Sequence, residues 1–447
     1  MQTNRRDLLA RSGALATAAL AGCLDDGGTP TRTSDGGGSD TPTVTETETQ
    51  SDPSAIDEER LAELAAGNAA FALDLHAHLA GDEGGNLFIS PYSISAALAM
   101  TYAGTRGETR EQMEATLKYT LGEEVHSGFG DLRTALAARE TTVDPRSDET
   151  VDAFQLDIAN ALWGREDYAF AEAYLDFLDA HYDAGLRRAD FAGDPDGERE
   201  RINEWVAETT EDRIDELLPR GSITAQTVLV LTNAIYFMAS WYQQFDPEET
   251  EDDTFTALDG TESTVPFMHQ HLRTNYAAVD GAEAIELPYV GEDVSMVFLL
   301  PEVGEFEAFE QTLDADRLFA IVGEMSDAAG DLAVPKFAFE TEVQLRDPLV
   351  ALGMPLPFTS DADFGGMVEN GDGPFIDDVY HDAFVTIDEE GTEAAAATAV
   401  VMDESAPPEW GELRLDRPFL FCIRDRPTDA VLFLGRVVDA GGAQETQ

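Results

Sequence analysis

The sequence predicts an α+β fold, because helical patterns gather in its first half and β-rich apolar runs in its second half. Hydrophobic residues make up 43% of the 447-residue chain, which is enough to build a packed core. From about residue 56 to residue 440 the sequence shows no internal repeat and no linker-like segment. We therefore expect one large domain at 56–440, followed by a short tail at 441–447.

The helices are predicted by apolar spacing. Leu61, Leu64, Phe71, Leu75 and Leu79 keep helical spacing and predict a long first helix. A hydroxyl-rich turn at 90–95 precedes a second helix at 96–100, and further helices are expected at 110–117, 171–181 and 199–218. The predicted strands are the β-rich apolar runs at 227–237, 294–300, 332–339, 384–387, 419–424 and 430–437.

The charge balance is strongly acidic. There are 27 Lys and Arg against 89 Asp and Glu, a formal net charge of -62. Phosphate binding needs clustered cations, so this balance excludes a nucleic-acid clamp. The carboxylates are spread over the whole chain, and molar salt would screen their mutual repulsion. The composition therefore predicts a protein from an extreme halophile, such as a halophilic archaeon.

The first 23 residues have the pattern of an export signal. Arg5 and Arg6 form a twin-arginine pair, an Ala- and Leu-rich stretch follows, and small residues precede Cys23. This order predicts a lipoprotein signal peptide at 1–23, with lipidation of Cys23 anchoring an extracellular protein to the outer face of the cell membrane. Residues 24–55 are Gly, Ser, Thr, Asp and Pro without an apolar period, which predicts a flexible linker.

Known catalytic motifs are missing from the sequence. It contains no Gly-x-Ser-x-Gly, no His-Glu-x-x-His, no phosphate-binding Gly-rich loop with Lys, and no paired cysteines. Residues His76 and His78 lie in a predicted helix, where such neighbours point apart. The pair His269 and His271 suits a strand, but ordinary partly buried imidazoles explain both pairs better than a metal. We expect no enzyme, no metal and no cofactor, and we expect Cys422 to be a buried apolar residue.

One segment near the C-terminus has an unusual composition. Residues 391–401 are mostly Ala and Thr, and such runs usually form helices. Here the run follows a β-like segment, opens with Gly391, passes into two valines and ends in an exposed, proline-rich loop at 402–408. A slim, β-competent segment of this kind could enter a gap in a sheet, whereas bulky or charged inward residues would block its entry.

Seven segments of the chain have a familiar pattern and order: 86–94, 202–206, 232–241, 287–289, 334–337, 418–421 and 433–436. With these segments, the chain resembles the serpin family. The resemblance implies three β-sheets, eight or nine helices and an exposed reactive-centre loop that a serine protease attacks as a substrate. It also implies a monomer that traps the protease in a covalent complex when the cleaved loop inserts into the main sheet.

The resemblance places the loop hinge before the reactive bond. On insertion Thr392, Ala394, Ala396 and Thr398 would face inward, and all four are small or β-branched, which favours inhibition. A non-inhibitory serpin that acts as a binding or chaperone-like surface protein is the alternative. The hinge comprises Glu389, Glu390, Gly391, Thr392, Glu393, Ala394, Ala395, Ala396, Ala397 and Thr398, and the reactive-bond candidates are Glu404, Ser405 and Ala406.

The cut is expected after Glu404 or Ser405, two alternatives that the sequence leaves open. Neither residue suits a trypsin-like protease, so a subtilisin-like extracellular protease is the expected target. No basic face appears near 125–139, so we expect no heparin-like activator.

The resemblance also names residues away from the loop. Ser90, Ser93, Asn233 and His381 are similar to the buried polar cluster beneath the strands that part, and Trp241 to the aromatic residue at the insertion point. Lys336 and Glu389 could pair at the loop base, and an ordinary surface ion pair of little worth is an equally good interpretation.

Overall fold

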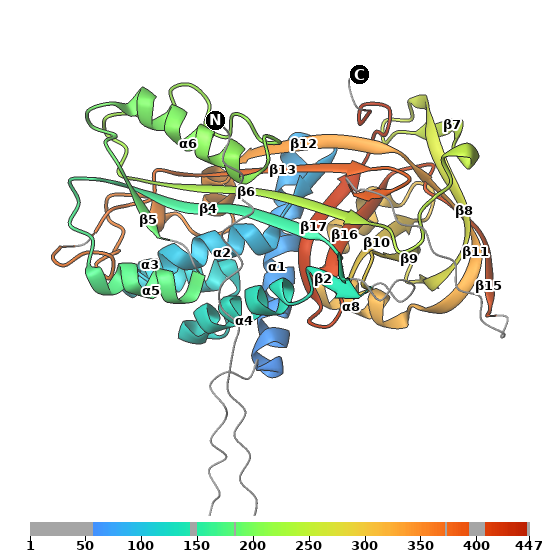
Figure 1. Ribbon diagram of the computed structural model, residues 1–447, viewed down its shortest axis with the longest axis horizontal. Helices are drawn as coiled ribbons and strands as arrows, with labels where there is room; N and C mark the ends of the chain where they lie inside the picture. The colour runs from blue at the N-terminus through green and yellow to red at the C-terminus, as the bar shows by residue number, and fades with distance from the viewer. Residues whose placement is uncertain (1–56, 144–149, 183–184, 372, 393–406, 445–447) are drawn as a thin grey trace, which may run out of the picture. The chain divides into compact units, whose positions relative to one another are not determined.

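A computed structural model describes residues 57–447 except 144–149, 183–184, 372, 393–406 and 445–447. Over this part of the chain the fold has nine α-helices and three β-sheets, which confirms the predicted α+β class (Figure 1). The predicted signal and linker, with Arg5, Arg6 and Cys23, lie outside the described residues. So do the hinge residues 393–398 and the reactive-bond candidates 404–406.

Helices form in all five places where the sequence predicted them, but two of their bounds were wrong. The second helix begins at Pro91, inside the turn expected at 90–95. The helices Val125–Ala137, Phe306–Thr312, Ala315–Glu324 and Arg346–Ala351 were not predicted. The helix expected at 199–218 ends at Thr209, because Glu211 and Asp212 adopt positive φ angles of 53° and 61°, which stop an α-helix. The chain then continues as a loop that the Asn203 side chain holds by accepting a hydrogen bond of 2.8 Å from the Leu218 amide. The helices are α1 (Glu58–Glu83), α2 (Pro91–Tyr102), α3 (Gly107–Leu117), α4 (Val125–Ala137), α5 (Glu172–Tyr182), α6 (Pro195–Thr209), α7 (Phe306–Thr312), α8 (Ala315–Glu324) and α9 (Arg346–Ala351).

The central sheet has the strand order β12-β13-β6-β4-β5, and the short strand β14 pairs with β6. Strands β6 and β13 are parallel neighbours, whereas β12 is antiparallel to β13 and β4 is antiparallel to β6. These strands are β4 (Gln155–Arg165), β5 (Leu186–Ala189), β6 (Leu229–Ser240), β12 (Phe337–Gln344), β13 (Asp378–Ile387) and β14 (Gly391–Thr392).

The second sheet has the order β1-β17-β16-β10-β9-β8-β11-β15, with β7 paired to β8, and the third is the hairpin of β2 and β3. The single strand predicted at 332–339 is wrong: the chain changes sheets at Lys336, between β11 and β12. The remaining strands are β1 (Leu87–Ile89), β2 (Thr141–Val143), β3 (Thr150–Asp152), β7 (Glu251–Thr256), β8 (Glu262–Val279), β9 (Ala282–Pro288), β10 (Val294–Pro301), β11 (Ser326–Pro335), β15 (Glu409–Arg414), β16 (Phe419–Asp425) and β17 (Ala430–Val437).

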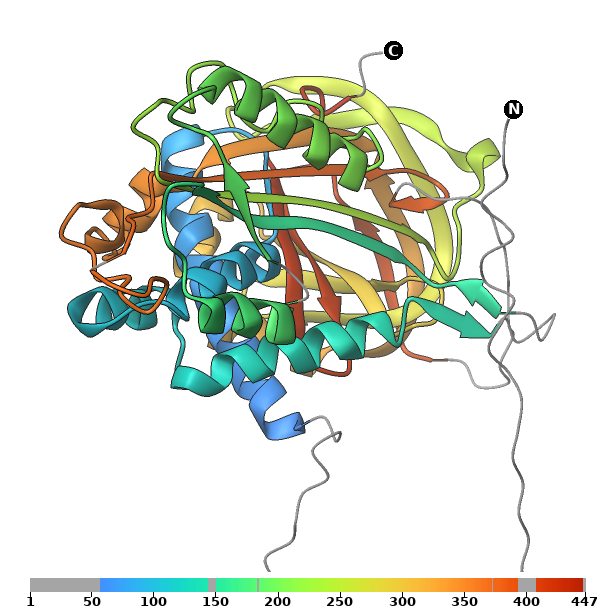
Figure 2. The same cartoon turned by 60° about the vertical axis from the view of Figure 1, so that its left-hand side comes forward.

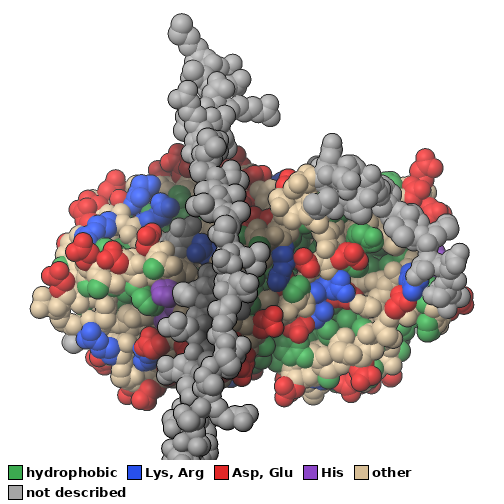
Figure 3. Space-filling model, turned by 60° about the horizontal axis from the view of Figure 1, so that its bottom comes forward, with side chains coloured by type: hydrophobic (Ala, Val, Ile, Leu, Met, Phe, Trp, Pro, Cys, Tyr) green, Lys and Arg blue, Asp and Glu red, His purple; other side chains and the backbone are tan. Residues whose placement is uncertain are grey.

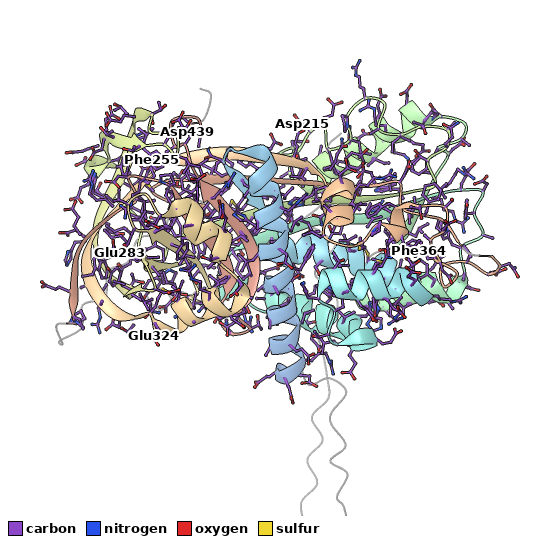
Figure 4. All side chains as sticks on the ribbon, turned by 180° about the vertical axis from the view of Figure 1, so that it is seen from behind. Asp215, Phe255, Glu283, Glu324, Phe364 and Asp439 are labelled. Atoms are coloured by element: carbon purple, nitrogen blue, oxygen red, sulfur yellow. The ribbon has the colours of Figure 1, made fainter. Side chains whose placement is uncertain are left out.

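Helices cover both faces of the central sheet (Figure 2). Helix α2 packs against β4 and β6 from one side, and α6 packs against β4 from the other. On the α6 side a small core forms around Trp163, Ile202, Val206 and Ala234. Helix α1 contacts β1 and β17 of the second sheet, and the view from behind shows it crossing the middle of the domain (Figure 4). The interface between the helices and the central sheet is therefore where buried groups can control strand movement.

Carboxylate side chains are scattered over the face shown in Figure 3 rather than gathered in one patch. Among the described helices, none combines the length and the hydropathy that a membrane span requires.

Candidate functional site

The candidate site is the seam between the parallel strands β6 and β13. Residues 230–235 of β6 pair with residues 378–383 of β13, and we call this stretch the closed half of the seam. Both strands continue, β6 to Ser240 and β13 to Ile387, but their described residues no longer pair with each other. We call this stretch, 236–240 and 384–387, the open half.

Strand β14 enters the open half at its far end. Gly391 pairs with Ser240 and Thr392 pairs with Ala239, antiparallel to β6. The sequence predicted an exposed loop from Gly391 onward, and for these two residues that is wrong: both are buried. Glycine is required here, because a Cβ on Gly391 would lie 2.1 Å from the carbonyl oxygen of Ala239. Two residues of the hinge, Gly391 and Thr392, therefore already pair with the central sheet.

Aromatic side chains fix the inserted end of the hinge. The Thr392 hydroxyl lies 2.7 Å from the Tyr289 hydroxyl, and Tyr289 stacks on Trp241 at a centroid distance of 4.7 Å. Trp241 donates from Nε1 to the Asp388 carbonyl at 3.0 Å and from its amide to the Glu390 carbonyl at 2.9 Å. Tyr289, which the sequence analysis did not assign to the site, thus joins the hinge to the second sheet.

The predicted loop-base residues are in contact. Lys336 Nζ lies 2.6 Å from Glu389 Oε2, and the Thr250 hydroxyl donates to Glu389 Oε1 at 2.7 Å. Burial alone would raise the pKa of the Glu389 carboxyl, but the hydrogen bonds from Lys336 and Thr250 outweigh it and the pKa lies below its usual value. Since the Glu389 side chain is only 11% exposed, the pair is more than a solvated surface contact.

A buried polar cluster lies beneath the closed half. Asn233 of β6 donates from Nδ2 to Ser93 Oγ at 2.6 Å and also to Asn160 Oδ1. Ser93 in turn donates to Asn160 Oδ1 at 3.1 Å, and Asn160 Nδ2 donates to the Ser93 carbonyl at 3.1 Å. His381 of β13 lies with Nδ1 2.5 Å from Asn233 Oδ1. The cluster therefore links the two strands of the seam to α2 and β4.

The second ring nitrogen of His381 defines its tautomer. Nε2 accepts from the Ser90 amide at 3.2 Å, so Nδ1 carries the proton and donates to Asn233. Burial lowers the pKa of His381 to about 3, so the ring is neutral at ordinary pH. Ser90 also donates from Oγ to the Leu432 carbonyl at 2.8 Å, which extends the cluster to β17.

The structure divides the predicted cluster and adds a member to it. Trp241 lies eight residues beyond Asn233 on an extended strand, about 26 Å away, and contacts the hinge instead. Asn160 was missed, because its strand, β4, was not predicted. The only signal for it was an asparagine inside the apolar run 158–163.

Two of the remaining histidines and Cys422 lie in other parts of the fold. His76 contacts Glu310 at 3.0 Å and His271 contacts Asp331 at 2.8 Å, so each imidazole engages a carboxylate. Cys422 is buried, and burial raises the pKa of its thiol to about 12, which leaves it protonated.

Comparison with known proteins places this fold. Residues 66–440 match the family described as Serpin (serine protease inhibitor). A serpin-like protein of Thermococcus kodakarensis whose function is uncharacterized is 39% identical over 373 residues, covering 83% of this chain and 84% of that protein. The leukocyte elastase inhibitor of Sus scrofa is 38% identical over 387 residues, covering 84% and 99%.

A solved structure agrees with these sequence matches. Tengpin, a thermophilic serpin in its native state, superposes with a TM-score of 0.73 at 27% identity, covering 86% of this chain and 95% of tengpin. The chain belongs to the serpin family, as the resemblance predicted, and it has the serpin fold. Many members of this family inhibit serine proteases.

Proposed function

We propose that this protein is a suicide-substrate inhibitor of serine proteases. The protease serine attacks the carbonyl of the reactive bond, an ester forms, and the peptide bond breaks with release of a new amino terminus. The cleaved loop then inserts between β6 and β13 before water can hydrolyse the ester. The protease remains covalently attached and inactive.

The observation that carries the proposal is the position of β14. A strand that enters between two parallel strands can pair antiparallel to both, and Gly391 and Thr392 already pair this way with β6. If the loop continued in the register that pairs Gly391 with Ser240, residue 398 would lie opposite Asn233. Inserted residues 391–395 would occupy the open half, and residue 396 would be the first to displace a β6–β13 pair.

The polar cluster supports an opening barrier at this point. Separation of the closed half would pull Asn233 and His381 apart, and a buried polar group that loses its partner costs about 1–3 kcal/mol. Cleavage makes the loop long enough to insert fully, and its backbone hydrogen bonds repay this cost. The small residues at 394, 396 and 398 pose no steric obstacle to insertion.

The proposed target is a subtilisin-like extracellular protease, which would cut this chain after Glu404 or Ser405. The name of the leukocyte elastase inhibitor supports a protease as the target, and neither Glu404 nor Ser405 suits a trypsin-like protease. We further propose that the protein is monomeric, comes from a halophile and is held extracellularly by lipidated Cys23. The net charge and the twin-arginine pattern support this part.

The test is to mix the full chain with subtilisin and with chymotrypsin in molar KCl and to measure product masses after denaturation. An adduct of protease plus cleaved chain, with loss of protease activity, is the expected result. The released C-terminal peptide would begin at Ser405 or Ala406 and so identify the bond. Clean cleavage without an adduct would favour the non-inhibitory binding or chaperone-like role.

A further inference from the structure

Three carboxylates meet on the central sheet, on the face opposite the polar cluster. Glu340 and Glu342 alternate along β12 and therefore share a face, and Asp382 of β13 lies directly across from Glu342. Their carboxylate oxygens all lie within 4.8 Å of one another. Across the described residues this is the one such group of three or more His, Cys, Asp or Glu side chains.

Asp382 separates this group from the ordinary acidic surface. It is 1% exposed, and its Oδ1 accepts no hydrogen bond from any described residue. None of the three carboxylates forms an ion pair with a described Arg or Lys. A buried carboxylate with one unpaired oxygen is costly in its charged form, so a proton or a cation must neutralise it.

The surroundings of Asp382 make this cost larger. The charged groups that face it are Glu340 and Glu342 from β12, and the β6 residue in register, Ala234, carries no charge. Burial first, and these two glutamates second, raise the pKa of Asp382 to about 8. A bound proton or a bound cation would relieve the repulsion, and the arrangement of three converging carboxylates favours the cation.

We propose that Glu340, Glu342 and Asp382 bind one Ca²⁺ ion. All the donors are oxygen atoms, the preferred ligands of hard cations, and there is no imidazole or thiolate to favour zinc. The carboxylate oxygens lie within 4.8 Å of one another, which is close enough for all three groups to bind one ion. Two exposed, adaptable glutamates beside one fixed aspartate also suit the variable coordination of Ca²⁺.

The ion ties the edge strand β12 to β13, the strand that forms one side of the seam. The sequence predicted no metal, because carboxylates on β12 and β13, about forty residues apart, cannot be paired from their spacing. The site depends on neither protease inhibition nor loop insertion, so it stands or falls separately from the proposed function.

The test uses the full chain, stripped with a chelator and kept in about 2 M KCl to suppress diffuse binding to the acidic surface. Calorimetric titration is expected to show one saturable Ca²⁺ site. At about 100 times the Kd, Ca²⁺ is expected to raise the Tm by about 4 °C, with a weaker response to Mg²⁺. Both the binding and the Tm response should be lost in Asp382→Asn and in Glu340→Gln/Glu342→Gln.

The matched control is Glu204→Gln/Glu208→Gln, which removes two exposed charges one turn apart on α6 and should keep the full Ca²⁺ response. Equal Ca²⁺ responses in all the variants would mean diffuse binding and would overturn the site. The site is also overturned if the wild type shows no Ca²⁺ response, since a proton would then satisfy Asp382. If Asp382→Asn does not fold, the glutamate pair decides, because those side chains are exposed.

Discussion

The two halves of the seam are built from the same two strands but differ in what holds them. In the closed half six residue pairs join β6 to β13, and a largely buried polar cluster lies beneath them. In the open half the described residues of β13 pair with β12 alone, while β6 pairs with the hinge residues Gly391 and Thr392, which form β14. The polar contacts thus link the two strands in one half, whereas in the other half β6 pairs with the hinge backbone instead of with β13.

This difference divides the proposed mechanism into an entry and a barrier. Entry requires residues that fit beside Ala239 and Tyr289, and the barrier depends on Asn233 and His381. Substitutions in the open half should therefore decide whether the loop enters the sheet. Substitutions in the closed half should change how easily the sheet opens.

The largest effect is expected from Thr392→Arg. Thr392 is 2% exposed and its hydroxyl contacts Tyr289, so a guanidinium there would be buried without a partner and would exclude the hinge from the sheet. The covalent adduct should fall by at least about 100-fold, while cleavage continues. A loss of about 3 kcal/mol of insertion free energy corresponds to about two factors of ten. Denaturing gels of the subtilisin reaction measure both products. Thr392→Val, which keeps the shape, should retain the adduct, and an unchanged adduct in Thr392→Arg would refute insertion at this position.

Asn233→Ala should weaken the closed half by about 2–3 kcal/mol, because it leaves His381 and Ser93 without a shared buried partner. The expected result is a lower urea midpoint in molar salt and faster spontaneous loss of inhibition on storage. Asn275→Ala, which removes a hydrogen bond to Glu286 in the second sheet, is the control. It should lower the midpoint without accelerating the loss of inhibition. Equal rates of loss in the two variants would mean that the polar cluster does not guard the seam.

The sequence predicted the contents of both halves better than their geometry. Long apolar periods located α1, β6, β10, β16 and β17, and the hinge residues and the members of the cluster on β6 and β13 followed from the serpin resemblance. Asn160, Tyr289 and Thr250 were missed, because each lies outside the predicted elements and reaches the site only through tertiary packing.

The partial entry of the hinge could not be predicted from local pattern. It depends on the pairing of Gly391 with Ser240, and these residues are 151 positions apart in the sequence. An exposed loop and an inserted strand have the same composition, so only the pairing with β6 distinguishes them. The same limit hid the carboxylates of β12 and β13, whose separation in the sequence says nothing about their contact.

Acid should open the closed half. The pKa of His381 in the folded protein, about 3, lies below the unfolded value near 6.5, so below pH 6.5 the unfolded chain binds a proton that the folded chain does not. The contribution of neutral His381 to the free energy of unfolding is therefore present above pH 6.5 and is lost as the pH falls toward 3. At pH 5.5 the free energy of unfolding should be lower by about 1.4 kcal/mol. The measurement is the rate of loss of inhibitory activity at pH 5.5 and 7.5 in molar salt.

His126 is the matched control for this acid effect. Burial, with smaller contributions from His181 and Arg110, lowers its pKa to about 3 as well, but it lies on α4 and contacts Tyr182 rather than the seam. Both His126→Gln and His381→Gln should therefore reduce the dependence of global stability on acid. Only His381→Gln should remove the acid-driven loss of inhibition, and the reverse result would place the sensitive group outside the seam.

The smallest effect is expected at the hinge base, from Lys336→Met. The substitution removes the ion pair with Glu389 but leaves the hydrogen bond from Thr250, and Lys336 is one-third exposed, so the loss should stay below about 1 kcal/mol. Adduct formation should therefore change by less than about 5-fold, and by less still in molar salt, where the Debye length is about 3 Å. Lys118→Met is the control, since the only other lysine pairs with Asp74 at 2.9 Å, away from the seam. The opposite outcome would be loss of the adduct in Lys336→Met, to the extent expected for Thr392→Arg. In that case the ion pair at the hinge base would control entry into the open half, and the fit of Thr392 beside β6 would not.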